Sequence, residues 1–344
     1  MIKRKKKNKE HNPFYDPTLK KRHVSAKRFK KFTLTSLIFS VAFLAFFLFD
    51  MIGKGIPAFN IAYVKVDVTF NEKTLEDTRF AVPTEYRNLV SRAALRDLPK
   101  LLEENPTYMN STQNIWILAS SQVDQYIKNH NHNLKDKDIA KVDELYAQGL
   151  IDKKFNAIFF ENGDSKIPEY AGIFSAVIGS ILTLIITMAV AFPIGVMTAI
   201  YLEEFAGDNK FTRFIEININ NLAAIPSILF GLLGLAIFIN LFGMPRSSPL
   251  VGGLTLALMT LPIIIVSSRA ALRAVPDSIR QAGYGLGLNK IQVTRDHVLP
   301  LAFPGIMTGS IIGLAQAMGE TAPLIIIGMI AFIPDAPSMV TQAA

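Results

Sequence analysis

The feature that most constrains this chain is a series of long stretches without charged residues in its second half. Residues 171–344 contain only 8 of the 36 Lys and Arg residues and 8 of the 28 Asp and Glu residues. Apolar runs of about 20 residues match the thickness of a bilayer and have no stable place in water. The sequence therefore predicts an integral membrane protein. Because the chain has no cysteine, disulfides and thiolate metal sites are excluded.

A basic arm and an apolar run form the N-terminal part. Residues 1–31 carry 13 Lys and Arg residues against two acids, and residues 32–52 form the expected transmembrane helix 1. The run is too long for a cleaved signal peptide. A basic arm can bind nucleic acid, but one that directly precedes a span is typical of cytoplasmic orientation. We expect an uncleaved anchor with a cytoplasmic N-terminus and no nucleic-acid partner.

Residues 53–170 differ from their surroundings, with 15 basic and 17 acidic residues and no apolar run of membrane length. Alternation of apolar side chains predicts a strand at 61–70, and helical spacing predicts helices at 87–104 and 138–150. A second strand is expected at 155–160. The segment is predicted to be a small extracytoplasmic α+β domain. Its composition does not indicate a function.

Two histidines in this domain, His130 and His132, lie among asparagines. A metal site is one interpretation of such a cluster, but no third ligand follows at a recognisable spacing. We expect a polar surface loop, no metal site and no cofactor.

The remainder, residues 171–344, predicts an all-α polytopic membrane domain. Pro193 is expected to kink the second span, and parity with the first helix makes the loops 203–221 and 269–300 cytoplasmic. These inner loops hold seven Lys and Arg residues, whereas the short outer segments hold only Arg246, in agreement with the positive-inside rule. The expected spans, after the first, are 171–202, 222–242 (interrupted by Pro226), 249–266 and 301–333 (broken at 319–323), which makes five in all.

The inner loop 269–300 contains a helix signal. Proline followed by acidic and hydroxyl residues at 276–278 is typical of a helix start, and glycines at 285 and 287 end or loosen the helix. A narrow face of small apolar residues suits close docking in a groove of another protein. That face comprises Ile279, Ala282, Gly283 and Leu286. Such a helix, tied to spans at both ends, is suited to transmitting motion from a soluble partner.

The spacing of this loop resembles the coupling-helix signature of type I ABC importer permeases. That signature has an acid-Ala-Ala start, Gly six positions on, and Leu-Pro twelve and thirteen positions later. Flanking segments at 199–205 (AIYLEEF), 225–231 (IPSILFG), 274–280 (AVPDSIR) and 319–324 (GETAPL) resemble the PstA-type permease of phosphate ABC importers over about 171–333. The N-terminal extracytoplasmic domain is similar to one found in part of that family. The residues assigned to ATPase coupling are Pro276, Asp277, Ile279, Arg280, Gln281, Ala282, Gly283, Leu286, Gly287, Leu299 and Pro300.

The chain departs from the family pattern at three positions and at its end. Gln281 stands in place of the usual Glu, Gly283 in place of the second Ala, and Gln316 in place of a common Arg. The family has a sixth span, so we expect the type I ABC importer permease fold with its last span missing after Ala344. An apolar segment of about 20 residues further along the coding sequence would confirm a truncation; a natural stop codon would refute it.

Glu320 is the one ionisable residue well inside a span. Charged groups within the bilayer are costly and mark functional sites by default, although Glu320 could instead lie near the outer end and pair with a partner subunit. The expected spans after the first contain no Lys or Arg, so high affinity for an anion is expected to reside in a separate binding protein. The expected translocation-pathway residues are Gln316, Gly319, Glu320, Thr321 and Pro323.

The resemblance implies a permease subunit of an ATP-driven importer of inorganic phosphate in the inner membrane, and no enzyme. Since the chain has no P-loop motif, ATP is hydrolysed by a partner ATPase, expected as a homodimer. The other implied partners are a second permease of the PstC type, an extracytoplasmic phosphate-binding protein and membrane lipid. The alternatives are a permease for another oxyanion or nutrient, such as sulfate or molybdate, and a membrane-tethered sensor that functions through residues 53–170.

Overall fold

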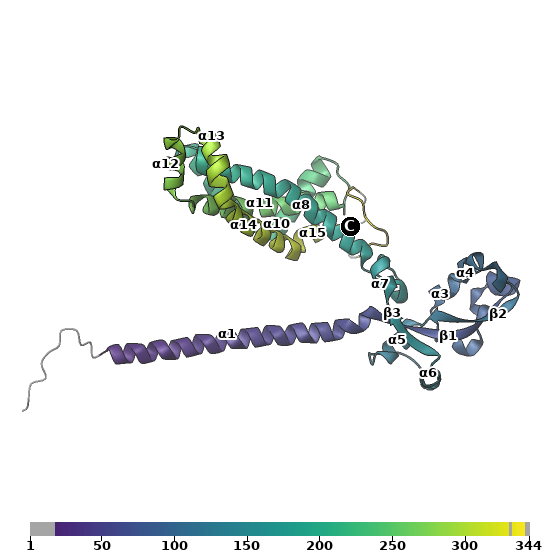
Figure 1. Cartoon of the computed structure of the whole chain (residues 1–344). Coiled ribbons are helices and arrows are strands. Elements are labelled where there is room, and N and C mark those ends of the chain that lie inside the picture. Colours follow the sequence, from purple (N-terminus) through teal and green to yellow (C-terminus); the bar gives the residue numbers. More distant parts are fainter. Residues whose placement is uncertain (1–17, 330–331, 341–344) are drawn as a thin grey trace, which may run out of the picture. The chain divides into compact units, whose positions relative to one another are not determined.

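The computed structural model describes residues 18–329 and 332–340 (Figure 1). The chain divides into two compact units, residues 1–61 and residues 62–344, which are described separately.

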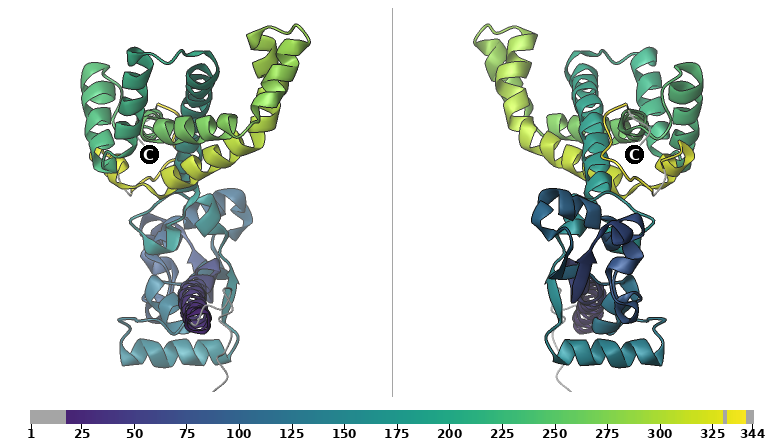
Figure 2. Two further views of the ribbon diagram at one scale, coloured as in Figure 1. Left: turned by 90° about the vertical axis from the view of Figure 1, so that its left-hand side faces the viewer. Right: turned by 90° about the vertical axis from the view of Figure 1, so that its right-hand side faces the viewer.

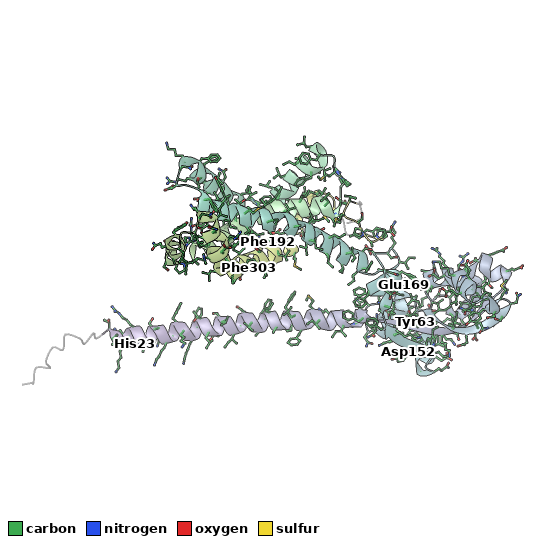
Figure 3. All side chains as sticks on the ribbon, turned by 45° about the horizontal axis from the view of Figure 1, so that its top comes forward. His23, Tyr63, Asp152, Glu169, Phe192 and Phe303 are labelled. Carbon is green, nitrogen blue, oxygen red and sulfur yellow. The ribbon has the colours of Figure 1, made fainter. Side chains whose placement is uncertain are left out.

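The first unit is dominated by one long helix, α1 (Leu19–Gly55), which continues into the 3-10 turn η1 (Ile56–Phe59). None of its side chains is buried in the structure, and Figure 3 shows them projecting on all sides. The helix includes the described part of the basic arm, so the arm and the expected transmembrane helix 1 are one continuous element. A helix that is apolar all round belongs in lipid or against a partner.

The segment that follows this helix in the sequence forms a three-stranded sheet. Its strands are β1 (Asn60–Phe70), β2 (Ser111–Leu118) and β3 (Ile151–Phe155), in the order β2-β1-β3. β1 runs antiparallel to β2, with Val66 opposite Ile115. Alternate β1 residues from Val64 to Phe70 are buried, which confirms the predicted strand. The sequence analysis missed β2 because its alternation is weak.

The helices around the sheet correct two predictions. A single helix over 87–104 is wrong: α3 (Arg92–Arg96) ends at Asp97, and α4 (Leu98–Glu104) restarts there with a proline in its first turn. The predicted strand at 155–160 is also wrong. Phe155 ends β3, and the Asn156 side chain then accepts a hydrogen bond from the Phe159 amide to start α7 (Ala157–Glu161).

The other predicted helix is present as α6 (Asp136–Ala147), which ends just before Gly149 at a φ of +70°. Two further views show the short helices around the sheet (Figure 2). The remaining elements here are α2 (Glu72–Glu76), η2 (Thr78–Ala81), η3 (Thr84–Tyr86), η4 (Pro106–Tyr108), α5 (Ser121–Ile127) and η5 (Pro168–Tyr170).

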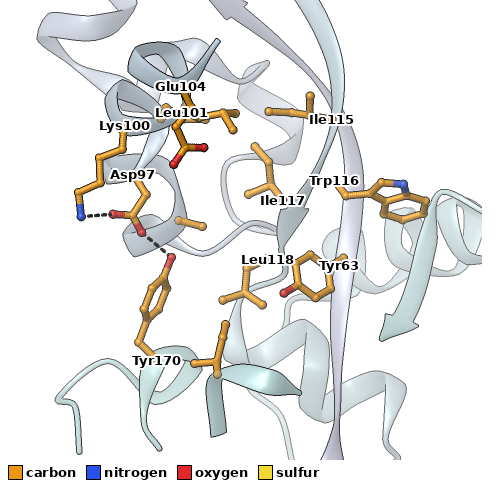
Figure 4. Close-up of a pocket in the computed structure, with 13 residues that line it drawn as sticks. Tyr63, Asp97, Lys100, Leu101, Glu104, Ile115, Trp116, Ile117, Leu118 and Tyr170 are labelled. Atoms are coloured by element: carbon orange, nitrogen blue, oxygen red, sulfur yellow. Dashed lines mark hydrogen bonds and ion pairs between the residues drawn. The ribbon is translucent and has the colours of Figure 1, made fainter. Parts of the chain in front are cut away.

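One hollow in this region, of about 460 Å³, opens beside β2 (Figure 4). The Tyr170 hydroxyl donates a 2.7 Å hydrogen bond to the Asp97 carboxylate, which also lies 3.6 Å from the Lys100 ammonium. Burial, followed by this hydrogen bond, raises the pKa of Tyr170 above its usual range. The bond thus ties the segment that precedes the membrane domain to the end of α3.

Three long apolar helices follow. The first is α8 (Phe174–Ile200), extended by a π-helical turn η6 (Tyr201–Phe205), and the second is α11 (Pro249–Arg273). The third is a continuous helix, Lys290–Gly319, made of α13 (Lys290–Val293), the π-turn η8 (Thr294–Val298) and α14 (Leu299–Gly319). The segment expected at 301–333 has the predicted break, since α14 ends at Gly319, but its helix starts earlier than expected, at Lys290 inside the predicted loop.

The expected span at 222–242 is broken. Helix α9 (Lys210–Ala223) takes its first two residues, and a bend of 104° leads into α10 (Ser227–Gly234) and the π-turn η7 (Leu235–Leu241). The bend falls at Pro226, because a residue that precedes proline avoids helical geometry. Including α1, the described residues contain four helices long and apolar enough to cross a membrane, or five if this bent pair is one span.

Small residues let the long helices approach closely. A Cβ atom on Gly253 of α11 would lie 2.6 Å from the Ile186 side chain of α8, and one on Gly195 would lie 2.8 Å from Ile264. Thr187 is buried and its hydroxyl donates to the Gly253 carbonyl at 3.2 Å. Close contact between small residues is the usual way in which membrane helices associate. The α8–α11 pair therefore forms the centre of the membrane domain.

Candidate functional site

The predicted coupling helix is present as α12 (Asp277–Gly285), nine residues that lie between the end of α11 and the start of α13. Pro276 precedes its first turn, and Asp277 lies at the positive end of the helix dipole. The chain leaves α12 through Gly287, whose φ of +81° requires glycine. The element is short, and long helices hold it at both ends.

The narrow apolar face predicted for α12 is divided by the fold. Gly283 is buried, and a Cβ atom there would lie 2.7 Å from Val293 of α13. Ile279 packs on the buried cluster that includes Leu272 and Val275. These two residues therefore pack α12 against its own domain.

The opposite side of the loop is open. Leu286 is 79% exposed and Tyr284 is 46% exposed. Ala282 and Gln281 are exposed beside them. An exposed leucine and tyrosine on a polar loop are typical of a contact surface.

The two most distant residues assigned to coupling lie on another element. Leu299 and Pro300 form the first turn of α14; Leu299 packs against the cluster that holds α12, and Pro300 is exposed. The structure thus places them within the continuous helix Lys290–Gly319, separate from α12.

Arg280 is the residue that fixes α12 in place. Its guanidinium donates to both Glu204 carboxylate oxygens, at 2.6 and 3.2 Å, and to the backbone carbonyls of Val275 and Leu272, at 2.8 and 3.0 Å. The side chains of Arg280 and Glu204 are only 16% and 5% exposed. The hydrogen bond to Glu204 raises the pKa of Arg280. A residue expected to reach an ATPase is therefore held inside its own subunit.

A second group of ion pairs lies beside the first. Glu203 accepts from Arg273 at 2.7 Å and from Arg269 at 3.3 Å, and Arg269 also donates to Glu216 of α9. The adjacent glutamates 203 and 204 lie on the π-turn η6 and thus meet arginines from different elements. π-Turns inside helices are rare and frequent at functional sites. The sequence analysis did not predict these acid partners; paired glutamates directly after a long apolar run were the signal.

We call Glu203, Glu204, Glu216, Arg269, Arg273 and Arg280 the arginine–glutamate brace. It joins the end of α8, the end of α11, α9 and α12 at one end of the membrane domain. Because most of these charged side chains are partly buried and all are paired, the brace links the four elements through side-chain contacts.

The expected pathway residues lie around the break between α14 and α15 (Ala322–Ile326). Glu320 ends α14 and is half-buried, and its carboxylate makes no hydrogen bond or ion pair with another described residue. Pro323 is buried, and its backbone lies against Gly231 of α10. Gln316, Gly319 and Thr321 are exposed. The structure brings these five residues together at one helix break, away from the brace.

The two histidines of the loop at 129–133 have different surroundings. His132 packs edge-on against the Tyr126 ring, at 4.9 Å between centroids, and His130 is exposed. Within residues 18–329 and 332–340, no three His, Asp or Glu side chains are placed to hold a metal ion.

Comparison with known families assigns two parts of the chain. Residues 191–338 match the family described as binding-protein-dependent transport system inner membrane component. Residues 16–86 and 81–136 match a domain of unknown function, DUF3333.

Similar proteins of known annotation align with the second half of the chain. The phosphate transport system permease protein PstA of Mycobacterium leprae is 36% identical over 160 residues, which are 46% of this chain and 52% of that protein. The protein of the same name from Yersinia pestis is 34% identical over 178 residues, 51% of this chain and 59% of that one. The probable ABC transporter permease protein YqgI of Bacillus subtilis is 33% identical over 168 residues, 48% and 56%. The chain thus spans about half the length of the relatives it matches.

Among solved structures, the inward-facing MetNI methionine ABC transporter aligns with a TM-score of 0.41 and 22% identity, over 46% of this chain and 76% of that chain. The family match and the relatives both fall on the second half of the chain, which also contains most of the long apolar helices. The chain is a multi-pass membrane protein whose residues 191–338 match the model of binding-protein-dependent transport system inner membrane components and are similar to PstA-type permeases.

Proposed function

We propose that this chain is one of two permease subunits of an ATP-driven importer of inorganic phosphate. The observation that carries the proposal is the short helix α12, exposed on one side and braced to α8 through Arg280 and Glu204 on the other. The similarity of residues 191–338 to permeases named for phosphate transport supports the choice of substrate.

The proposed mechanism begins with a contact between the ATPase and the exposed side of α12. A cytoplasmic ATPase, a homodimer, contacts Tyr284 and Leu286 and moves α12 when ATP closes it. Arg280 passes that movement to α8, and the Gly283–Val293 contact passes it to the helix that starts at Lys290. The long helices then rearrange between inward- and outward-open states. This subunit makes and breaks no covalent bond; ATP is hydrolysed by the partner.

The remaining parts follow from the same scheme. The N-terminus and α12 lie in the cytoplasm, and residues 53–170 lie outside the inner membrane. A second permease of the PstC type completes the pathway, and an extracytoplasmic binding protein supplies affinity for phosphate. The absence of Lys and Arg from the apolar segments after the first supports this division of labour.

Purification of the full-length protein from its own membranes tests the scheme. An ATPase and a second permease are expected to co-purify, and uptake assays with phosphate, sulfate and molybdate are expected to show transport of phosphate. Transport of sulfate or molybdate instead would assign another oxyanion. A protein that purifies alone and transports none of the three would contradict the proposal and favour a membrane-tethered sensor.

Leu286→Asp is expected to weaken binding of the ATPase to the permease. The leucine is the most exposed apolar side chain of the loop, and a charge in the centre of an apolar contact costs more than about 1.4 kcal/mol, or about tenfold in affinity. The amount of ATPase that co-elutes with the permease measures the effect. Leu286→Met keeps the apolar contact and serves as the control; equal co-elution of both variants would remove Leu286 from the contact surface.

Glu320→Gln is expected to lower the initial rate of phosphate uptake by about tenfold, because an unpaired carboxylate at a helix break is a costly feature retained for function. Asp335→Asn makes the same chemical change at an exposed site and is expected to leave uptake unchanged. Uptake at the wild-type rate by Glu320→Gln would end its assignment to the pathway.

A further inference from the structure

The basic side chains of residues 62–170 gather around one hollow. This part of the chain holds 14 Lys and Arg residues against 17 Asp and Glu residues, so composition does not produce the clustering. A hollow of about 650 Å³ is lined by five cations and two carboxylates from three segments of the chain. We call it the basic hollow; its charged residues are Arg87, Arg92, Arg96, Lys135, Lys166, Asp138 and Glu169.

The cations of the basic hollow are not neutralised within the described part of the chain. No ion pair is present at Arg92, Arg96 or Lys135, all exposed. Elsewhere in the same region, several cations do form ion pairs: Lys128 lies 2.5 Å from Asp124, and Lys100 lies 3.6 Å from Asp97. The lining thus carries a net charge of +3 (five cations less two carboxylates) that faces solvent.

The floor of the basic hollow is held in place. The Arg87 guanidinium lies 4.8 Å from the centre of the Phe80 ring, and its Nε donates to the Val82 carbonyl at 3.3 Å. The Glu169 carboxylate accepts from the Ser121 amide at 2.7 Å. Arg92 and Arg96 lie four residues apart on α3 and therefore share one face of that helix.

We propose that the basic hollow docks an acidic surface of the extracytoplasmic substrate-binding protein, an inference that rests on the proposed function. Guanidinium groups pair with carboxylates through two parallel hydrogen bonds, so the unpaired arginines select clustered Asp and Glu side chains. The volume accommodates several such side chains and exceeds what a single oxyanion fills. Exposed cations bind a small ion weakly in water. A partner surface that covers the hollow excludes water from the ion pairs, so we expect it to bind more tightly than a small ion does.

The reconstituted importer, with its ATPase and second permease in nanodiscs, provides the test. The measurement is ATPase activity as a function of the concentration of the loaded binding protein, at about 0.1 M and about 0.5 M NaCl. The test variant is Arg92→Glu/Arg96→Glu. The matched control is Lys153→Glu/Lys154→Glu, which reverses two exposed charges on β3, outside the basic hollow.

The test variant is expected to raise the half-maximal concentration of binding protein by about tenfold or more at low salt, since charge steering changes association rates by 10- to 1,000-fold. Maximal activity stays at the wild-type level, and high salt removes the difference. The control behaves as wild type.

Three outcomes would overturn the inference. Equal half-maximal concentrations for the test variant and the wild type would show that the basic hollow does not dock the binding protein. Selective loss, in the test variant, of binding to inorganic phosphate would assign a small-oxyanion site, and selective loss of binding to phosphatidylglycerol vesicles would assign a lipid site. If no binding protein stimulates the wild-type complex, the proposed function itself fails, and this inference with it.

Discussion

Arg280→Ala is expected to abolish most phosphate uptake while the protein still inserts in the membrane. The substitution removes the partner of Glu204, whose side chain is only 5% exposed, and leaves its charge buried without compensation. Breaking a buried ion pair in this way costs roughly 3–5 kcal/mol. Since Arg280 also holds the carbonyls of Leu272 and Val275, α12 loses its main attachment to the rest of the subunit.

The readout separates coupling from folding. Uptake is expected to fall by about tenfold or more, because each 1.4 kcal/mol changes an equilibrium tenfold, while ATPase activity becomes insensitive to the loaded binding protein. Arg295→Ala is the matched control: that arginine lies in the same loop, is 70% exposed and pairs only with its neighbour Asp296. Wild-type uptake by Arg280→Ala would show that α12 does not depend on the brace.

The double variant Arg280→Ala/Glu204→Ala tests the same contact from the other side. It removes both charges, so no unpaired carboxylate remains, and its stability is expected to exceed that of Arg280→Ala. Transport is still expected to be low, because the link from α12 to α8 is absent in both variants. Recovery of full transport would show that Arg280 only neutralises Glu204 and transmits no movement.

Gly253→Leu is expected to prevent the α8–α11 pair from forming. A Cβ atom alone would lie 2.6 Å from the Ile186 side chain and 2.8 Å from the Thr183 carbonyl. A leucine adds three more carbon atoms, and overpacking of this kind costs about 3 kcal/mol. The yield of monodisperse protein in detergent and its apparent Tm are both expected to fall sharply.

Gly53→Leu is the control for this experiment, because no atom lies within 4 Å of a Cβ at Gly53. It adds the same side chain to a long apolar helix and is expected to keep the yield and the apparent Tm of the wild type. Normal stability of Gly253→Leu would mean that α8 and α11 do not pack at this glycine.

Much of the architecture follows from local sequence. Uncharged runs located α1, α8 and α11, since a segment of that length and composition has no alternative to lipid. The alternation around Val66 located β1. The interruption expected at Pro226 is present as a bend of 104° after α9. The strand expected at 155–160 failed because a single local feature overrides periodicity: Asn156 caps a helix there.

The candidate site was only partly predictable for the same reason. The sequence located α12 and the glycine at 283, but spacing on a helix shows which residues share a face and not what that face meets. The structure turns Ile279 and Gly283 inward and leaves Leu286 in solvent. Of the face predicted to contact a partner, Ile279 and Gly283 thus contact the chain itself, and Leu286 remains available to a partner.

The sequence by itself determined that this chain spans a membrane several times and carries a short helix between two long ones. Both properties depend on contiguous residues and on transfer of apolar side chains out of water. Only the tertiary structure decided the role of Arg280, because its partner Glu204 lies 76 residues away along the chain. Ion pairs between distant segments depend on how the helices pack, which no local pattern encodes.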